Sequence, residues 1–510
     1  MGVVRPSLLN RISDITRKMA APSEGDSPSL FSRLSPVPRF PPYAGPHKVG
    51  TVDVEIPIAK LQSPGETPEE ASGIHTVQFR IFYPAVPDSA GPRITWLPAP
   101  QRLHLAAYSQ FLGAGPKLAS LLSYLPRNLH YITIPVHKNA AVLQPNTVPS
   151  QTRWPTIIFS HGLGGTRNAY SYIAGSLASH GAIVICPEHR DGSAAISLVR
   201  DPNPPSTPKT WFSSRPTPQT VPYLGIGHNF DTASWSARNR QIRIRLWELT
   251  LTYEALLGID TNTLSTSNLN TSTPPRALSQ LSSLLDIHTP GKLIFSGHSF
   301  GAASIVQLLK STYYFDRLPA VFPAPSPSLR RQITPHTPLI LLDMWCFPLL
   351  SRASAPLFRL PLPQYDGPAA PGGAAILAVE SETFYKWKQH LHMKARILSP
   401  DPTQPVVTAE SFTRGDGTEV PRPRVFYVRR AAHLNQSDFG VLWPWITNKV
   451  FGVEKPERCL RLNGRAMLEF LRGRGRRMGE EMEPALASPV EGEAGGKKGG
   501  GEGVVVKGKE

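Results

Sequence analysis

Short apolar runs alternate with helical patterns along most of the 510-residue chain. Runs typical of buried strands cover residues 156–160, 182–186, 292–295, 337–342, 374–379 and 424–428. Helical patterns cover residues 170–180, 235–257, 302–309 and 439–450. Strands that alternate with helices predict an α/β fold, with a mostly parallel central sheet flanked by helices. Residues 49–58 and 76–83 alternate in polarity and predict a hairpin of half-buried strands.

A Gly-x-Ser-x-Gly motif, formed by Gly297, Ser299 and Gly301, joins the predicted strand at 292–295 to the predicted helix at 302–309. A strand, a sharp turn and a helix are the context of the nucleophile elbow in α/β-hydrolases. The turn is tight, so the positions two before and two after the serine must lack bulky side chains. The helix N-terminus offers free N–H groups that stabilise a developing anion. The motif therefore predicts Ser299 as a nucleophile.

Partners for Ser299 are expected at the ends of other strands. Residues 161–165, His-Gly-Leu-Gly-Gly, follow a predicted strand and form the type of turn that supplies one oxyanion-hole N–H in α/β-hydrolases. His433 follows the last predicted strand, where the general base is expected. The acid that orients it is either Asp343, after the strand that follows the elbow helix, or Glu380 or Glu382, after the next strand.

Two charged groups have alternative interpretations. Residues 188–191, Glu-His-Arg-Asp, end a predicted strand, and they fit either a substrate-binding group or a structural ion-pair cluster. Arg238, Arg240, Arg243 and Arg245 lie on the predicted helix at 235–257, where we expect a solvated basic face.

Aromatic and aliphatic residues indicate a possible lipid interface. Residues 103–125 predict one or two helices broken near 113–116. Their apolar side chains, with those of the predicted helix at 439–450, fit either the core or a membrane surface. The candidate interface residues are Tyr108, Phe111, Leu112, Trp443 and Trp445.

Composition sets the domain boundaries. The chain contains 54 prolines, and clusters of Pro, Ser, Thr and Asn predict an irregular insertion at about 200–230 and a flexible surface loop at about 261–280. We expect a disordered basic arm at 1–45, a catalytic domain at 46–455, a helix at 456–472 and a disordered tail at 473–510. Residues 1–20 also resemble a mitochondrial presequence, although Asp14 counts against that alternative.

Charge and cysteine content narrow the function classes. The net charge of +17 comes without zinc-finger spacing or an RNA-binding aromatic motif, so we expect attraction to anionic membranes and no nucleic-acid binding. Three cysteines are too few for a disulfide framework and suit a reducing compartment. No secretory signal or 18-residue apolar run is visible, which predicts an intracellular, cytoplasmic protein with peripheral membrane association. No metal-ligand cluster is visible, and we expect no metal, no cofactor and no obligate protein partner.

Several blocks together resemble the platelet-activating-factor acetylhydrolase family, of the plasma and intracellular type II kind. They lie at residues 159–164, 188–191, 297–301, 342–348 and 433–439, and the resemblance runs from about residue 43 to 452. The Asp-x-Trp-x-Phe-Pro and His-x-Asn-x-x-Asp-Phe blocks are far more specific than Gly-x-Ser-x-Gly. The resemblance implies an α/β-hydrolase fold and the triad Ser299, Asp343 and His433. It also implies that the backbone N–H groups of Leu163 and Phe300 form the oxyanion hole.

The resemblance further implies a calcium-independent serine esterase. Its substrate would be the short-chain (acetyl) or oxidised sn-2 ester of a glycerophospholipid at a membrane or micelle surface. The Pro-rich insertion and basic tail are similar to fungal-type members. Secreted members carry a signal peptide that this chain lacks, and Pro6 spoils the myristoylation signal of lipidated members. Two alternatives stay open: a general carboxylesterase acting on soluble short-chain esters, and a catalytically silent hydrolase-fold scaffold.

Overall fold

The computed structural model describes residues 37–124, 127–145, 151–202, 219–228, 231–318, 321–414, 416–444, 455–476 and 478. Five of the expected features fall wholly or partly outside these ranges. They are the N-terminal arm up to residue 36, most of the insertion at 200–230, the second half of the helix expected at 439–450, Trp445 and almost all of the tail.

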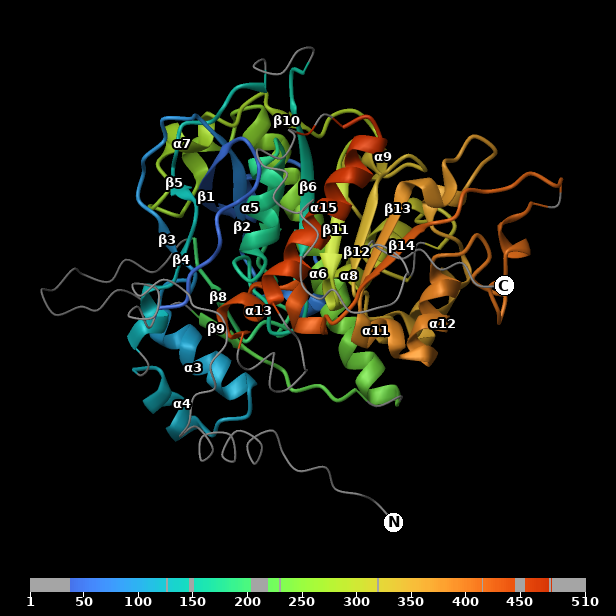
Figure 1. The fold of residues 1–510 in the computed structure, drawn as a ribbon, viewed down its shortest axis with the longest axis horizontal. Helices are drawn as coiled ribbons and strands as arrows, with labels where there is room; N and C mark the ends of the chain where they lie inside the picture. The colour runs from blue at the N-terminus through green and yellow to red at the C-terminus, as the bar shows by residue number, and fades with distance from the viewer. Residues whose placement is uncertain are drawn as a thin grey trace, which may run out of the picture.

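A mostly parallel sheet forms the centre of the molecule (Figure 1). In the described residues its strands are β1 (Lys48–Pro57), β2 (Thr76–Ala85), β5 (His137–Lys138), β6 (Trp154–Ser160), β7 (Ile183–Pro187), β10 (Leu285–Asp286), β11 (Ile294–His298), β12 (Leu339–Leu342), β13 (Ile376–Ser381) and β14 (Arg424–Val428). The order is β14-β13-β12-β11-β6-β7-β2-β1-β5, with β10 beside β6. Strand β2 runs antiparallel to β1 and β7, and the other pairs are parallel. This order confirms the predicted fold class.

Two small sheets lie beside the central one. They pair β3 (Ile94–Thr95) with β4 (Thr133–Ile134), and β8 (Ile196–Val199) with β9 (Gln219–Pro222). Strand β9 gives regular structure to part of the insertion that was expected to have none. Strand β2 is buried at every position and β1 at all but two, because other elements cover both faces of the sheet here, so the expected half-buried pattern is wrong for both strands.

Helices cover both faces of the sheet. The described α-helices are α3 (Gln101–Phe111), α4 (Pro116–Leu122), α5 (Ser171–Ser179), α6 (Thr232–Asp260), α7 (Pro275–Ser279), α8 (Phe300–Tyr313), α9 (Pro327–Gln332), α10 (Ala355–Arg359), α11 (Glu382–Lys386), α12 (Lys388–Ile397), α13 (Asp438–Leu442) and α15 (Pro456–Gly473). Apolar residues of α6 and α8 pack into one core cluster, and those of α5 and α15 pack into a second. The predicted break near residue 113 separates α3 from α4, which lie together at the lower left of Figure 1.

The Ser/Thr/Asn tract at 261–280 is anchored, contrary to the expected flexible loop. Its Asn268 Oδ1 accepts the N–H of Glu55 at 2.9 Å, and Thr273 Oγ1 accepts the N–H of Asp53 at 3.0 Å. Leu278, on α7, is fully buried. The polar side chains therefore accept hydrogen bonds from backbone N–H groups of β1. Composition alone predicts solvent exposure for the same side chains.

The basic helix face is also different from the expectation. Arg240 is exposed and Arg243 is half-buried, but Arg238 and Arg245 are fully buried on α6. Arg238 donates to the side-chain oxygen of Gln241 on the same helix, and Arg245 pairs with Asp191 from another part of the chain. The prediction of a solvated face is wrong for these two arginines.

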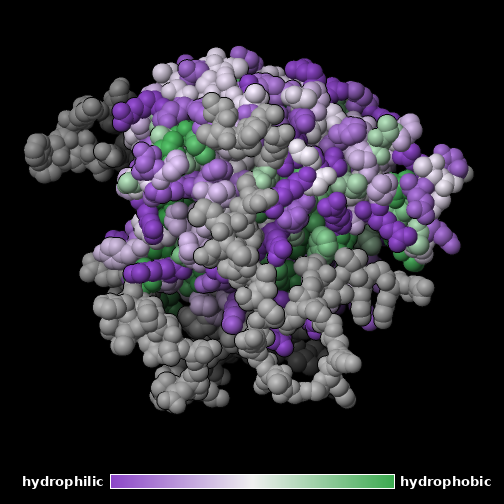
Figure 2. Space-filling model, turned by 45° about the horizontal axis from the view of Figure 1, so that its top comes forward, coloured by the Kyte–Doolittle hydropathy of each residue, from purple (hydrophilic) through white to green (hydrophobic). Residues whose placement is uncertain are grey.

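The described surface is mainly hydrophilic. Figure 2 shows purple and white residues over most of the visible described face, with hydrophobic side chains mainly in recesses. Among the described residues, no helix combines the length and the apolar character needed to cross a membrane.

Candidate active site

A strained turn presents Ser299 between β11 and α8. Its backbone has φ 56° and ψ −117°, a region that non-glycine residues rarely adopt. The motif glycines allow the turn. A Cβ on Gly297 would lie 2.6 Å from the carbonyl carbon of Gly301, and one on Gly301 would lie 2.0 Å from the carbonyl oxygen of Ser160. A side chain at either glycine would clash with the backbone, so the turn requires both glycines of the motif. Ser299 lies where a nucleophile elbow places its nucleophile.

Gly301→Ala is expected to lower the free energy of unfolding by about 3 kcal/mol, because the new methyl group meets rigid backbone of β6. Urea unfolding measures the change. Gly73→Ala is a matched control, since a Cβ there meets nothing within 4 Å. Equal stability of the two variants would contradict the assigned turn geometry.

Three side chains from separate parts of the chain form a hydrogen-bonded relay. His433 begins the 3₁₀-helix η11 (His433–Gln436), and its Nε2 lies 2.9 Å from Ser299 Oγ. Its Nδ1 lies 2.9 Å from Oδ2 of Asp343, which follows β12. A carboxylate can only accept, so Nδ1 carries the proton and the neutral ring leaves Nε2 free to accept the Ser299 O–H. The structure thus brings together the three residues predicted from the sequence.

Asp343 is held from two sides. Its Oδ1 accepts the N–H of Ser381 at 2.6 Å, and its Oδ2 accepts the Ser381 O–H at 2.6 Å. Burial by itself raises the pKa of this carboxyl, but the hydrogen bond and charge of His433 outweigh it and hold the pKa below the ordinary value. Asp343 is therefore an ionised, fixed partner for the imidazole.

The alternative acids lie elsewhere. Glu380 is fully buried and pairs with Lys394 of α12. Burial, only partly offset by Lys394, raises the pKa of Glu380 to about 7. Glu382 begins α11 and pairs with Lys386. Of the three carboxylates that the sequence left open, Asp343 is the one that contacts His433.

The turn at 161–165 packs against the nucleophile. A Cβ on Gly162 would lie 3.0 Å from Cβ of Ser299. The N–H groups on either side of Leu163 are engaged: that of Gly162 donates to Tyr170 Oη at 3.1 Å, and that of Gly164 donates to the Ser193 carbonyl at 2.7 Å.

The two predicted oxyanion donors keep their N–H groups available. Phe300 is the first residue of α8, so its N–H has no carbonyl within the helix to bond to. No acceptor is found for the N–H of Leu163 among the described residues. Both residues adjoin Ser299, one through the chain and one through the packed turn, which is the arrangement an oxyanion hole requires.

An apolar cavity of about 670 Å³ opens onto the relay. Ser299, His433 and Leu163 line it together with four of the candidate interface residues, Tyr108, Phe111, Leu112 and Trp443. Tyr108 is buried, whereas Phe111 and Leu112 are exposed. Aromatic rings from several elements complete the wall, including Trp96, Trp345, Phe347, Phe384, Trp387 and Phe439. Helix α3 is thus a wall of the cavity, and it also reaches the molecular surface.

His298 is the remaining polar neighbour of the relay. Its ring lies 4.4 Å from that of His433, and its Nδ1 lies 2.7 Å from Tyr170 Oη. Burial and the adjacent His433 hold the pKa of His298 well below its ordinary value. Among the described residues, His298, Asp343 and His433 are the one His/Cys/Asp/Glu group close enough to share a metal ion. Both ring nitrogens of His433 already face hydrogen-bond partners, so the group is arranged for proton transfer.

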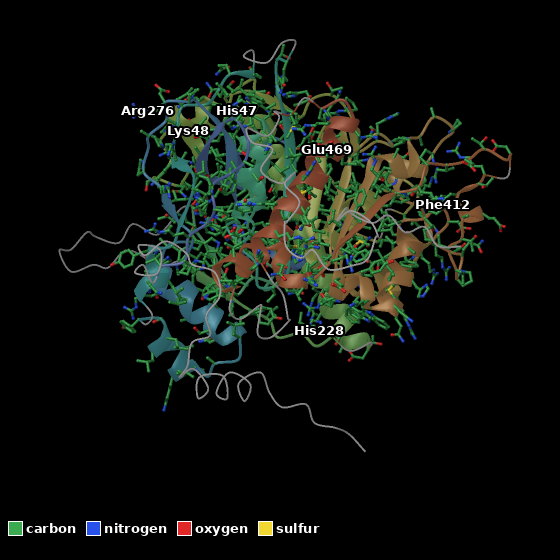
Figure 3. The ribbon with its side chains drawn as sticks, in the orientation of Figure 1. His47, Lys48, His228, Arg276, Phe412 and Glu469 are labelled. Carbon is green, nitrogen blue, oxygen red and sulfur yellow. The ribbon has the colours of Figure 1, made fainter. Side chains whose placement is uncertain are left out.

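Some contacts of the site were not anticipated. Ser381 supports Asp343, and the Phe384 ring stacks on His433 at 4.2 Å with planes 7° apart. His228, labelled in Figure 3, packs edge-on against Trp345 at 5.0 Å. Ser381 lies between Glu380 and Glu382, the two alternative acids, at the end of a predicted strand. Its position in the sequence therefore indicates that it lies near the catalytic acid. The other two contacts join segments with no common sequence pattern.

The charged run at 188–191 is a structural ion-pair cluster. All four side chains are buried. Glu188 pairs with Arg167, Arg190 with Glu248, and Asp191 with Arg245. None of the four lines the cavity at Ser299. The second of the two sequence-based interpretations therefore describes this run.

The strand order, the strained serine turn and the Ser–His–Asp relay define an α/β-hydrolase of the serine ester hydrolase class. Within that class, the chain belongs to the family described as platelet-activating factor acetylhydrolase, isoform II, whose family model matches residues 33–482.

Sequence relatives are consistent with this placement. A putative phospholipase A2 from Schizosaccharomyces pombe is 28% identical over 85% of this chain and 92% of its own length. Platelet-activating factor acetylhydrolases from Cavia porcellus and Bos taurus are 30% and 28% identical over 46% and 57% of this chain, and the match spans about half of each (47% and 55%). A solved ferulic acid esterase from Streptomyces cinnamoneus matches 89% of this chain and 97% of its own, at 14% identity and a TM-score of 0.45.

Proposed function

We propose that the protein hydrolyses the sn-2 ester of glycerophospholipids that carry a short, acetyl-like or oxidised acyl chain. The observation that carries this proposal is the opening of the Ser299–His433–Asp343 relay into an apolar cavity of about 670 Å³. That volume lies within the usual range for small-ligand sites, about 300–1,000 Å³. No Asp, Glu, Lys or Arg of the described residues lines the cavity, so it suits the acyl ester and leaves the charged headgroup outside.

The geometry supports a two-step acyl transfer. Ser299 Oγ attacks the ester carbonyl while His433 Nε2 takes its proton, and Asp343 stabilises the resulting imidazolium. The N–H groups of Leu163 and Phe300 hold the tetrahedral oxyanion. His433 then returns the proton to the departing lyso-lipid oxygen. Water, deprotonated by His433, attacks the acyl-serine, and His433 returns that proton to Ser299 Oγ as the fatty or acetic acid is released.

Calcium has no role in this proposal. Asp343 accepts hydrogen bonds from His433 and Ser381, and no described Asp or Glu lines the cavity to supply the oxygen ligands that Ca²⁺ requires.

A matched pair of substrates tests the proposal. Purified wild-type protein is assayed with an sn-2-acetyl ether phosphocholine in micelles and with p-nitrophenyl acetate, each in the presence of a chelator. Hydrolysis of the phospholipid is expected, and it should be lost in Ser299→Ala. Turnover of the soluble ester alone would replace the proposal with a general carboxylesterase. A wild type inactive on both would favour the scaffold.

We further propose that α3 and α4 contact the lipid surface that delivers the substrate. Exposed large hydrophobic side chains gather on and beside these helices, namely Phe111, Leu112, Leu118, Leu121 and Tyr124. Leu121 is 60% exposed and does not line the cavity, so it separates surface binding from substrate binding. A membrane buries such side chains at its interface, which stabilises the bound protein.

Leu121→Asp is expected to weaken binding to phosphatidylcholine/phosphatidylserine vesicles by about tenfold, because the leucine contributes on the order of 1–2 kcal/mol when buried. Its rate on p-nitrophenyl acetate should match the wild type. Val406, 63% exposed in another part of the surface, provides the control Val406→Asp, which should bind normally. Vesicle sedimentation measures both, and unchanged binding of Leu121→Asp would reject the α3–α4 surface.

A further inference from the structure

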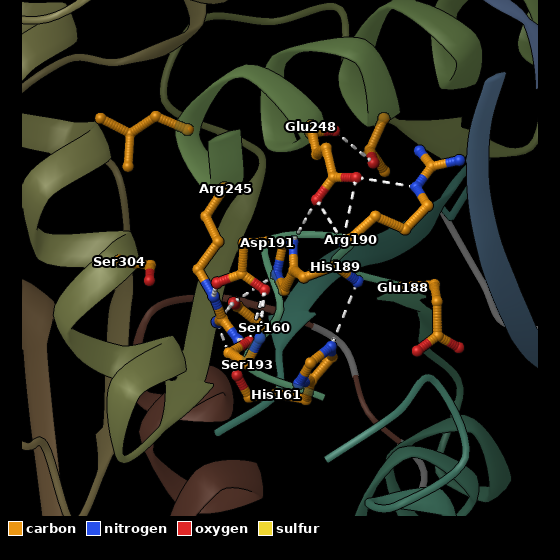
Figure 4. A network of polar contacts seen from close by, with 12 residues as sticks. Ser160, His161, Glu188, His189, Arg190, Asp191, Ser193, Arg245, Glu248 and Ser304 are labelled. Carbon is orange, nitrogen blue, oxygen red and sulfur yellow. Dashed lines mark hydrogen bonds and ion pairs between the residues drawn. The ribbon is translucent and has the colours of Figure 1, made fainter. Parts of the chain in front are cut away.

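A single buried guanidinium contacts both sides of the candidate oxyanion hole. Arg245, on α6, donates from Nη1 to the carbonyl oxygen of His161 at 2.8 Å, two residues before Leu163. Its guanidinium carbon also lies 4.4 Å from the ring centroid of Phe300. Figure 4 shows the Arg245 side chain reaching from α6 into the group formed by Ser160, Asp191 and Ser193.

The orientation of Arg245 is fixed by further contacts. Its Nε donates to Asp191 Oδ2 at 2.7 Å, and its Nη2 donates to Ser193 Oγ at 2.5 Å. Asp191 Oδ1 accepts the Ser193 N–H at 3.1 Å and the Ser193 O–H at 2.5 Å. Each side chain in this triangle therefore restrains the other two.

The triangle reaches the oxyanion turn by a second path. The carbonyl oxygen of Ser193 accepts the N–H of Gly164 at 2.7 Å. Leu163 is thus bracketed, with His161 held by Arg245 on one side and Gly164 held by Ser193 on the other. On the opposite side of the hole, the Phe300 ring packs against the same guanidinium.

Stability alone does not explain this arrangement. The Asp191 and Arg245 side chains have no solvent exposure. Removing two charges from water costs several kcal/mol per ion, and apolar replacement of a buried pair is often neutral or stabilising. What a fully satisfied buried pair does provide is fixed geometry, because a planar guanidinium has its donors in a rigid fork.

We propose that Arg245 is a positioning residue for ester hydrolysis, which with Asp191 and Ser193 holds the N–H groups of Leu163 and Phe300 at the separation that the oxyanion needs. Arg245 does not touch the substrate and transfers no proton. The inference rests on the proposed serine esterase activity and does not depend on which ester is cleaved.

Arg245→Lys tests the proposal, because lysine keeps the charge but cannot reach Asp191, Ser193 and the His161 carbonyl together. We expect kcat to fall about 10²-fold with KM changed less than about threefold, as for a catalytic group displaced by about 1 Å. A trifluoromethyl ketone forms a tetrahedral serine adduct whose oxyanion uses the same N–H groups. Its affinity should fall by the same factor as kcat. Active sites are counted with a fluorophosphonate, and p-nitrophenyl acetate is the substrate.

Arg190→Lys is the matched control. Arg190 is also fully buried and paired with an acid, Glu248, but its guanidinium donates to Thr76 on β2. We expect a fall in Tm comparable with that of Arg245→Lys and a kcat within about threefold of the wild type. Ser193→Ala is a milder second variant that keeps the carbonyl bond to Gly164. It should lower kcat and inhibitor affinity in parallel by about fivefold.

Three results would overturn the proposal. Arg245→Lys could retain its kcat, lose no more kcat than Arg190→Lys, or lose kcat without losing inhibitor affinity. If Arg245→Lys does not fold, Ser193→Ala decides, and an unchanged kcat in that variant overturns the inference. A wild type active on p-nitrophenyl acetate but not on the phospholipid would reject the proposed substrate and leave this test intact. A wild type inactive on both esters would remove the proposed function and this inference together.

Discussion

Ser299→Ala is expected to lower kcat for ester hydrolysis by about 10⁵–10⁶-fold, the largest effect of any single change in this chain. The serine oxygen is the one nucleophile within reach of His433 Nε2, at 2.9 Å, among the described residues. Without it, His433 can only assist water, and no acyl-enzyme forms. The residual rate would come from the oxyanion donors and from binding in the cavity.

Ser296→Ala controls for the loss of a buried hydroxyl next to the site. Ser296 lies on β11 and is fully buried, and no hydrogen-bond partner of its Oγ is found among the described residues. That variant should keep kcat within a few-fold of the wild type. Stopped-flow detection of the first turnover and mass spectrometry of the acylated protein measure both variants. A folded Ser299→Ala protein with more than about one thousandth of the wild-type rate would assign the nucleophile elsewhere.

Local chemistry made the nucleophile turn predictable. A tight turn between a strand and a helix tolerates few residues, so Gly297 and Gly301 signal its geometry without any knowledge of the rest of the fold. The same holds for the turn that contains Leu163. Parallel strands place their carboxyl ends along one edge of a sheet, which is why His433 could be expected beside Ser299 although 134 residues separate them.

The local sequence does not determine which of three carboxylates is the acid that orients His433. Asp343, Glu380 and Glu382 all stand at strand ends, and the sequence pattern treats them alike. What separates them is the direction of each side chain. Asp343 adopts φ 41°, a strained backbone conformation, and points to His433, while Glu380 points to a lysine on α12. The family resemblance singles out Asp343 among the three carboxylates, whereas hydrophobic periodicity does not distinguish them.

The burial of charged side chains could not be predicted from the sequence, for a different reason. A hydropathy pattern counts Arg245 as polar and so predicts that it is exposed. The pattern cannot show that Arg245 has a buried acidic partner, because Asp191 lies 54 residues earlier in the chain. The cavity wall was hidden in the same way. Helix α3 places Tyr108 inside and leaves Phe111 exposed, and an apolar stripe in the sequence does not show where the boundary falls.

Asp343→Asn is expected to lower kcat by about 10⁴-fold in a folded protein, through the tautomer of His433. The Ser381 N–H faces Asp343 Oδ1, and a backbone N–H can only donate. In the asparagine variant, the amide oxygen must therefore take the Oδ1 position. The NH₂ group takes the Oδ2 position, where it faces His433 Nδ1 and the Ser381 hydroxyl.

An NH₂ donor at that position reverses the hydrogen bond to the imidazole. His433 Nδ1 must now accept, so the ring proton moves to Nε2 and points at Ser299. A protonated Nε2 cannot take the serine proton, although the side chains keep their places. We expect KM to stay within a few-fold of the wild type, and fluorophosphonate labelling of Ser299 to slow in parallel with kcat.

Glu380→Gln and Glu382→Gln separate this tautomer effect from the loss of any acid near the site. Glu380→Gln should lower the free energy of unfolding by about 3 kcal/mol, because Lys394 is left buried without its charge partner. Glu382→Gln, at a half-buried position, should change stability by less. Neither carboxylate contacts His433, so both variants should keep kcat within about tenfold of the wild type. If a folded Glu380→Gln protein loses as much kcat as Asp343→Asn, the buried Glu380–Lys394 pair controls the imidazole. In that case the direct contact from Asp343 is not sufficient to orient His433.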